Sequence, residues 1–271
     1  MKQPTHYYKY TTVDTFEKIV SSKTLLLFDI KKSNDSSELQ LCYSLIEKVF
    51  EEEFEKDKPN YIKNYFPSTE FKKFFKENTE QINEIEKLLN TQYTTCFSAE
   101  GDMLSQWRGY GDDGKGVSIG FDISAFPSTD LYKFNKVIYS ERSQKKLLRE
   151  DIKLIIKDIR KYIKQNKTIE GYPCQKFKED YNHLLLWAVF IKNIFFHEEK
   201  EWRYSYWYNK RLDNVPHQIS KHSIKKIIIG PKSNITKEDV DFILRNNGFV
   251  GYTIEYSKGH GIYVDSRNHN N

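Results

Sequence analysis

The sequence is poor in cysteine, glycine and proline and has no long apolar run, and these shortages exclude several classes of protein. It holds three cysteines in 271 residues, Cys42, Cys96 and Cys174, which lie too far apart for a CxxC pair. An odd, scattered set of cysteines argues against a disulfide framework and against a cysteine-ligated zinc site. No apolar run approaches the roughly 18 residues of a membrane-spanning helix, and the start, MKQPTHYYKY, lacks the apolar core of a signal peptide. We therefore expect a cytoplasmic protein without a membrane partner.

The common nucleotide and metal motifs are missing as well. No GxxxxGKS or GxGxxG loop is present, which argues against an ATP-driven enzyme and against a Rossmann dinucleotide site. The seven histidines show neither HExxH nor HxH spacing, so we expect no dedicated zinc site. The 43 basic and 38 acidic residues leave a net charge of +5, which is too small at this length to require nucleic acid as a partner.

Apolar and aromatic residues are plentiful, and their spacing predicts the secondary structure. The chain is 38% hydrophobic and 15% aromatic, enough for a packed core. Helical periodicity is found over 39–56, 69–90, 143–165, 175–196 and 237–246. Short runs rich in β-branched and aromatic residues predict strands at 24–28, 93–97, 117–121, 136–139, 201–208, 225–230 and 251–256. The pattern predicts one α+β domain over 1–271, a mixed, mainly antiparallel split sheet with helical insertions at about 39–90 and 143–196.

One candidate site lies on the predicted strand around Glu201. Because successive side chains of a strand point to opposite faces, Glu199, Glu201 and Arg203 should share one face and Trp202 and Tyr204 the other. Two carboxylates and a guanidinium are costly to bury unless they pair or line a polar cleft. The strand therefore has two interpretations: a solvated face with a Glu/Arg pair, or the wall of a cleft.

A second candidate site is the glycine-rich segment 96–117, which holds Trp107, Arg108 and Tyr110 between two predicted strands. Loops of this kind bring backbone close to a ligand and supply aromatic faces for a flat ring. The alternative is a tight turn with a packed tryptophan.

Together these segments resemble the bacterial family called domain of unknown function 2971. The resemblance rests on an opening Tyr-x-Tyr-Thr, an Asn-Asp-x-x-Glu turn, a Cys-Phe-Ser strand end, a long Trp-to-Asp block, a Glu-rich strand and an Ile-Ile-x-Gly strand. In this chain these are residues 8–11, 34–38, 96–98, 107–122, 196–203 and 228–230. Ser36 stands where the family usually has proline, and the Pro-Tyr-Arg ending common in the family is missing.

A weaker resemblance links the opening segment 8–14 to ADP-ribosyltransferases of the DNA-targeting toxin type. Glu199-Lys200-Glu201 is similar to the paired-glutamate strand of the arginine-directed branch. The resemblance implies an ADP-ribosyltransferase-like fold and NAD as substrate. It makes Glu201 the catalytic glutamate and lets Glu199 orient or deprotonate the acceptor. A role in phage defence or as a toxin is what such a resemblance implies.

The same resemblance assigns the contacts to the nucleotide. It lets the residues Tyr8, Tyr10, Ser98, Trp107 and Tyr110 contact NAD, with the aromatic rings against its nicotinamide and adenine. Arg108 or Arg203 would meet the pyrophosphate. Lys9 stands where the known transferases usually have His or Arg.

Two other functions stay open. Glu198 and Lys200 spell Glu-x-Lys and, with Asp112 or Asp113, would suit a metal-dependent nuclease. A nucleotide-binding or partner-binding module without catalysis would keep the aromatic loop and tolerate loss of Glu201. The basic helix face at 144–164 is a candidate site for a nucleic-acid or protein acceptor, or an ordinary solvated surface.

Overall fold

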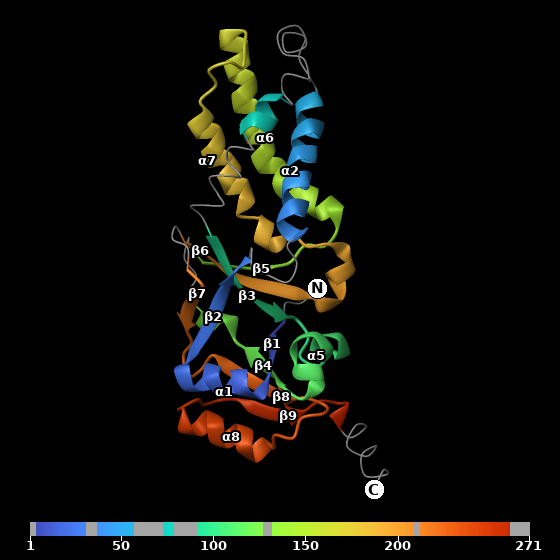
Figure 1. Cartoon of the computed structure of the whole chain (residues 1–271), viewed down its shortest axis with the longest axis vertical. Helices are drawn as coiled ribbons and strands as arrows, with labels where there is room; N and C mark the ends of the chain where they lie inside the picture. The colour runs from blue at the N-terminus through green and yellow to red at the C-terminus, as the bar shows by residue number, and fades with distance from the viewer. Residues whose placement is uncertain are drawn as a thin grey trace.

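The computed structural model describes residues 4–30, 37–56, 73–78, 91–126, 132–208 and 212–260. These residues form a lobe of long helices at one end of a sheet, and two short helices cover the other end (Figure 1). The predicted α+β class is confirmed, since long helices and a mostly antiparallel open sheet share the chain. Within the described ranges, no helix has both the length and the apolar character needed to cross a bilayer.

Nine strands of the described residues form the sheet. In spatial order β5-β6-β3-β1-β4-β8-β9 follow one another, while β2 pairs with β3 and with β7. Every pairing is antiparallel except that of β8 with β9, which α8 connects in the predicted β-α-β order. The strands are β1 (Tyr7–Thr11), β2 (Thr24–Asp29), β3 (Thr91–Ser98), β4 (Val117–Phe121), β5 (Tyr132–Lys136), β6 (Glu201–Tyr208), β7 (Asn214–Gln218), β8 (Ile224–Ile229) and β9 (Thr253–Tyr256).

The sheet divides at β3. This strand pairs with β6 along its whole length, but with β1 at a single position, where Tyr8 lies opposite Ser98. Farther along β3, Phe28 of β2 pairs with Thr94. Strands β1 and β2 therefore diverge from one strand, which leaves an opening between them in the sheet.

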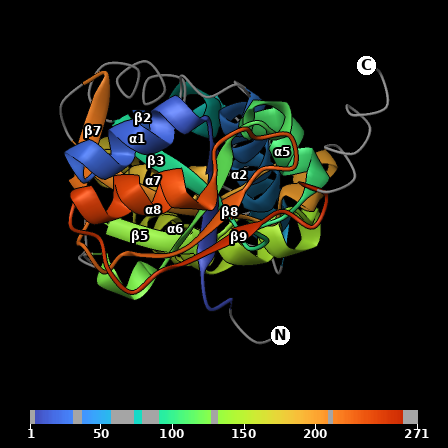
Figure 2. The same ribbon diagram turned by 90° about the horizontal axis from the view of Figure 1, so that it is seen from below.

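The helices occupy two regions. They are α1 (Val13–Ser22), α2 (Ser37–Glu55), α5 (Leu104–Tyr110), α6 (Glu141–Asn166), α7 (Cys174–Leu185) and α8 (Lys237–Asn246). Helices α1 and α8 lie side by side against the sheet (Figure 2). Helices α2, α6 and α7 enclose an apolar core of their own, with Phe50, Ile156 and Phe177 fully or almost fully buried. The described parts of the two predicted helical insertions thus pack on each other and form the lobe. The prediction of one domain stays a prediction.

The basic face of α6 is partly used inside the lobe. Arg149 binds the carboxylate of Glu52 at 2.7 Å, and Arg160 donates to the backbone carbonyls of residues 53, 54 and 56 near the end of α2. The bonds of Arg160 satisfy carbonyls that a helix end leaves without partners. Four lysines of this face, Lys146, Lys157, Lys161 and Lys164, are exposed and have no ion pair among the described residues.

The predicted helix over 175–196 is wrong beyond Leu185. There the chain continues as two 3₁₀ segments, Ala188–Phe190 and Ile194–Glu199. The apolar run reads as a buried helix because residues 188–191 are all buried where the lobe meets the sheet. Burial of a short irregular segment produces the same composition as burial of a helix.

Other boundaries also differ. The strand predicted at 136–139 is wrong beyond Lys136, where β5 ends, and Ile138 makes only an isolated bridge with Ile191. Strand β7 was not predicted, because Pro216 interrupts its apolar pattern; proline is tolerated in β7 because it pairs on one side only, with β2. The predicted helix over 69–90 is helical at 73–78, and its remaining residues lie outside the described ranges.

Candidate functional site

A cavity of about 510 Å³ lies at the opening in the sheet. Its walls include residues of β1, β3 and β6, of the end of β2, of α5, of the start of α2 and of the 3₁₀ segment that precedes β6. The cavity therefore lies at the junction of the helical lobe and the sheet. Ligand sites of globular proteins have about this size, roughly 300–1,000 Å³.

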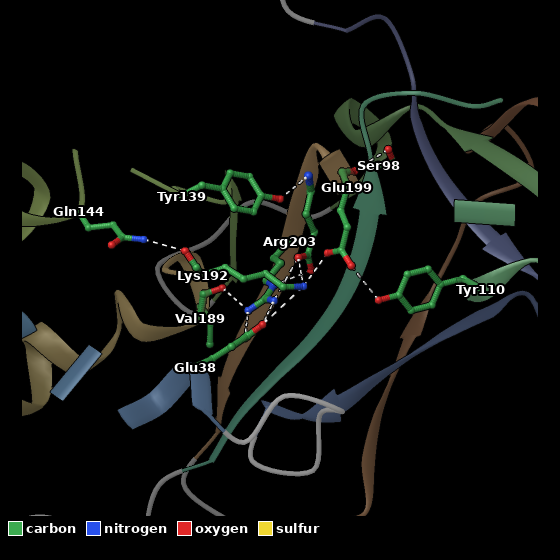
Figure 3. A network of polar contacts seen from close by, with 10 residues as sticks. Glu38, Ser98, Tyr110, Tyr139, Gln144, Val189, Lys192, Glu199 and Arg203 are labelled. Carbon is green, nitrogen blue, oxygen red and sulfur yellow. Dashed lines mark hydrogen bonds and ion pairs between the residues drawn. The ribbon is translucent and has the colours of Figure 1, made fainter. Parts of the chain in front are cut away.

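Arg203 of β6 is the centre of a buried ionic network on the cavity wall (Figure 3). Its Nη1 and Nη2 donate to the two carboxylate oxygens of Glu38 at 2.7 and 2.9 Å, and its Nε donates to Glu201 Oε1 at 2.7 Å. Nη2 also donates to Glu201 Oε2, and Nη1 to the carbonyl of Val189. A guanidinium has five N–H donors, so Arg203 has none left for a ligand.

Lys192 extends this network to a third carboxylate. Its Nζ donates to Glu199 Oε2 at 2.6 Å and to Glu201 Oε2 at 3.0 Å, and it lies 3.6 Å from Glu38. The backbone carbonyl of Lys192 accepts a bond from Gln144 at 2.8 Å, which fixes the segment that carries the lysine. One ammonium therefore holds the Glu199 and Glu201 carboxylates beside each other.

Glu199 and Glu201 reach the cavity by different means. Strand alternation places Glu201 and Arg203 on the cavity side and Tyr204 in the sheet core, as predicted. Glu199, however, belongs to the 3₁₀ segment before the strand, and Lys200 between them is in the left-handed region with φ 47°. The sharp turn at Lys200 brings Glu199 to the same cavity wall.

The two carboxylates differ in their acidity. Burial by itself raises the pKa of Glu201, but the charges of Arg203 and Lys192 outweigh burial and hold it at about 2. Burial also raises the pKa of Glu199, and there the single bond to Lys192 does not cancel the effect. The hydroxyl of Tyr110 donates to Glu199 at 3.2 Å. One carboxylate is thus firmly ionised and its neighbour is a weaker acid than an ordinary glutamate.

Most of the site residues predicted from the sequence meet at this cavity. Seven of the nine line it: Tyr8, Tyr10, Ser98, Tyr110, Glu199, Glu201 and Arg203. The hydroxyl of Tyr10 is already engaged, since it donates to the carbonyl of Glu100 and accepts from the amide of Met103. Ser98 donates to the carbonyl of Glu199 at 2.8 Å and so fixes the 3₁₀ segment.

Trp107 and Arg108 do not line the cavity. The indole of Trp107 is buried, packs edge-on against Tyr10 and donates to Asp102 at 2.8 Å. Asp102 also accepts from Ser257, so the tryptophan belongs to a packed junction with the segment after β9. Arg108 is exposed on α5.

The cavity residues that were not predicted as site residues include Lys9, Glu38, Cys96 and Lys192. The sequence could have indicated Lys192, because a single lysine within a buried apolar run needs a polar or charged partner. Nothing in the sequence indicated Glu38, because its position is typical of a turn before a helix. Cys96 is exposed in the cavity wall, and desolvation by the surrounding protein together with the charge of Glu201 raises the pKa of its thiol to about 12, so the thiol stays protonated.

The residues considered for a nuclease lie elsewhere. Glu198 and Lys200 are exposed, and Lys200 pairs with Glu100 at 3.0 Å. Asp113 pairs with Lys232. In the portion of the chain that is described, no three acidic, histidine or cysteine side chains gather in a way that suits a metal ion.

Residues 106–204 match the model of a family described as a protein of unknown function, DUF2971. The resemblance to this family is thus confirmed over α5, β4, β5, α6, α7 and the first half of β6. The matched range includes Lys192, Glu199, Glu201 and Arg203, whereas Glu38 precedes it. No curated protein and no solved structure matches the chain.

Proposed function

We propose that the cavity is the active site of an enzyme that cleaves the bond between nicotinamide and ribose in NAD⁺. The observation that carries the proposal is the pair of carboxylates on one ammonium, with the pKa of Glu201 depressed and that of Glu199 raised. Environments that push two neighbouring carboxylates apart in pKa are typical of sites where one is a charged stabiliser and the other handles a proton.

Cleavage of this bond needs one carboxylate that stays charged and one that takes up a proton. As nicotinamide leaves with the electron pair of the broken bond, positive charge develops on the ribose, and an ionised carboxylate stabilises that charge. Glu201 supplies it at any pH near neutrality. Water or an acceptor group then adds to the ribose carbon and gives up a proton. Glu199, the more exposed of the two carboxylates, takes up that proton. With water the product is ADP-ribose, and with an acceptor group it is an ADP-ribosylated molecule.

The walls suit a nucleotide in part. Tyr8 and Tyr110 present rings to the cavity, as a stacked base requires. Arg203 is not proposed as the pyrophosphate contact, because its donors are all used within the protein. Arg108 lies outside the cavity, so it would meet only a part of the nucleotide that projects from the mouth.

The first test is release of nicotinamide from NAD⁺ by the purified protein, with and without added DNA, RNA and protein extract. We expect release by the wild type, loss of release in Glu201→Gln and in Glu199→Gln, and normal release in Glu198→Gln, which changes an exposed neighbour. Thermal unfolding of each variant separates lost chemistry from lost folding. No release by the wild type under any of these conditions refutes the proposal.

A non-catalytic nucleotide-binding module is the second candidate. It is favoured by the complete use of Arg203 and by the strong pairing of Glu201, which are also what a structural ion network needs. Such a module would bind NAD⁺ or a related nucleotide in calorimetry and leave it intact. A metal-dependent nuclease would need Glu198 and Lys200 at the site, and it gains no support from this cavity.

The partners and the cellular role of the protein are also proposals. The four exposed lysines of α6 are the place where a nucleic-acid acceptor would bind, and such binding should weaken steeply as salt rises. A role in phage defence or as a toxin requires that the protein deplete cellular NAD⁺, so NAD⁺ content after expression in bacteria tests it.

A further inference from the structure

The charged side chains of the cavity wall include one more carboxylate than cations. Among the described residues that line the cavity, the acids are Asp29, Glu38, Glu199 and Glu201, and the bases are Lys9, Lys192 and Arg203. In the ionic network alone, two cations hold three carboxylates. Glu199 is the most exposed of these three, since its side chain is 17% exposed and those of Glu38 and Glu201 are 3% and 6%. Because a carboxylate out of water needs a compensating charge, the cavity favours a positively charged ligand beside Glu199.

The three cations of the wall are all engaged within the protein. Arg203 uses its five donors on two carboxylates and a carbonyl, and the ammonium of Lys192 donates to two carboxylates. The amine of Lys9 donates to the hydroxyl of Thr95 at 2.9 Å and lies 6.0 Å from the centre of the Phe97 ring, on the side of the sheet that faces the apolar core. A phosphate group in the cavity would therefore meet carboxylates without a cation to offset them, which is unfavourable.

Aromatic rings lie beside the carboxylate that is most exposed. Tyr110 and Phe196 line the cavity and are themselves exposed. The hydroxyl of Tyr110 donates to Glu199 at 3.2 Å, which holds this ring next to the carboxylate (Figure 3). The ring of Phe196 already lies near a cation, the Lys192 ammonium, 4.7 Å from its centre. Since a cation is attracted both by a carboxylate and by an aromatic face, a flat cationic ring is the ligand that matches these neighbours.

We propose that the cavity binds a cationic riboside without phosphate groups, a pyridinium ring on ribose as in nicotinamide riboside, in preference to NAD⁺. The ring supplies the positive charge that the wall lacks, the ribose is neutral, and no phosphate meets the carboxylates. The ribose part of this inference rests on the proposed function, because the bond to be cleaved is the same. In that cleavage the electron pair of the carbon–nitrogen bond leaves with nicotinamide, water adds to the ribose carbon, and Glu199 takes up the proton that water loses. The products are nicotinamide and ribose, and no oxidant or reductant is consumed.

The first part of the test is calorimetry with two rings that cannot be cleaved. The probes are 1-methylnicotinamide, which has the cationic ring, and nicotinamide, which is neutral. We expect the wild type to bind the cationic ring about tenfold more tightly, the effect of one nearby unit charge in a partly solvated site. Glu199→Gln should lose most of this preference, whereas Glu198→Gln, which changes an exposed neighbour, should keep it. Equal binding of the two rings by the wild type overturns the proposal, and that comparison depends on no variant.

The second part compares the release of nicotinamide from nicotinamide riboside and from NAD⁺ by the wild type. We expect kcat/KM to be about tenfold higher for the riboside, because the phosphates of NAD⁺ are repelled by the carboxylates of the wall. Faster cleavage of NAD⁺ overturns this inference and leaves the proposed chemistry intact. Cleavage of neither compound, with tighter binding of 1-methylnicotinamide than of nicotinamide, refutes the proposed chemistry and supports the recognition of a cationic ring.

Discussion

Replacing Arg203 by methionine removes the cation that joins the helical lobe to the sheet. The substitution keeps a long side chain on β6 but leaves the carboxylates of Glu38 and Glu201 in the interior with Lys192 as their remaining cation. Arg203 is 2% exposed and Glu38 is 3% exposed, so water cannot replace the lost bonds without opening the junction.

Two arguments give the size of the effect. Removing one partner of a buried ion pair costs about 3–5 kcal/mol, because the remaining charge is left uncompensated. Independently, lowering the pKa of Glu201 from 4.5 to about 2 corresponds to roughly 3 kcal/mol of preference for the ionised carboxylate. We therefore expect Arg203→Met to lower the free energy of unfolding at pH 7 by about 3–5 kcal/mol.

The pH dependence tests whether charge is the cause. The folded protein holds the pKa of Glu201 below its unfolded value, so this contribution is present above about pH 4.5 and is lost as pH falls toward 2. Arg203→Met should lack most of this contribution of Glu201 to the free energy of unfolding. The difference between wild type and variant in urea unfolding, followed by circular dichroism, should therefore shrink as pH falls below 4.5.

The matched control is Arg245→Met, which removes an arginine from an exposed pair with Asp241 at 2.7 Å. Surface pairs of this kind contribute less than about 1 kcal/mol, so its unfolding should be nearly that of the wild type. A loss below 1 kcal/mol for Arg203→Met refutes the reasoning. A difference that stays constant from pH 7 to pH 3 assigns the effect to packing instead of charge.

Three further predictions concern a close backbone contact, a buried histidine and the site. Gly116→Ala should lower the free energy of unfolding by about 1–3 kcal/mol, because the added Cβ would meet the backbone of β1. Gly109→Ala, where the added Cβ meets open space, should be neutral or slightly stabilising, and thermal unfolding checks both variants. His217 is buried among aromatic rings, and burial lowers its pKa. Its contribution to the free energy of unfolding is therefore present above about pH 6.5 and is lost as the pH falls below that value. His217→Phe should flatten the fall in melting temperature between pH 7 and pH 5. Burial raises the pKa of Glu199, and the hydrogen bond from the Tyr110 hydroxyl lowers it. Tyr110→Phe should therefore move the pH profile of NAD⁺ cleavage to higher pH. An unchanged profile would mean that Glu199 does not titrate in the reaction.

Much of the fold could be predicted because it follows from local patterns. Helices α2, α6 and α8 have one apolar face each, and strands β3 and β6 of the cavity wall are short and rich in aromatic and β-branched residues. The prediction was wrong at 186–196, where buried residues without regular structure have the composition of a buried helix. Composition reports burial, and it does not distinguish the shapes that a buried segment can take.

The sequence by itself determined that Glu201 and Arg203 share a face opposite Trp202 and Tyr204, because side chains alternate along any strand. Only the tertiary structure decided what that face meets. Glu38 lies 165 residues from Arg203 in the chain and reaches it because α2 and β6 converge where the lobe joins the sheet. The opening at which the cavity lies exists because β1 and β2 diverge from β3. Local geometry sets the direction of a side chain, and the partner of a buried charge depends on how distant segments pack.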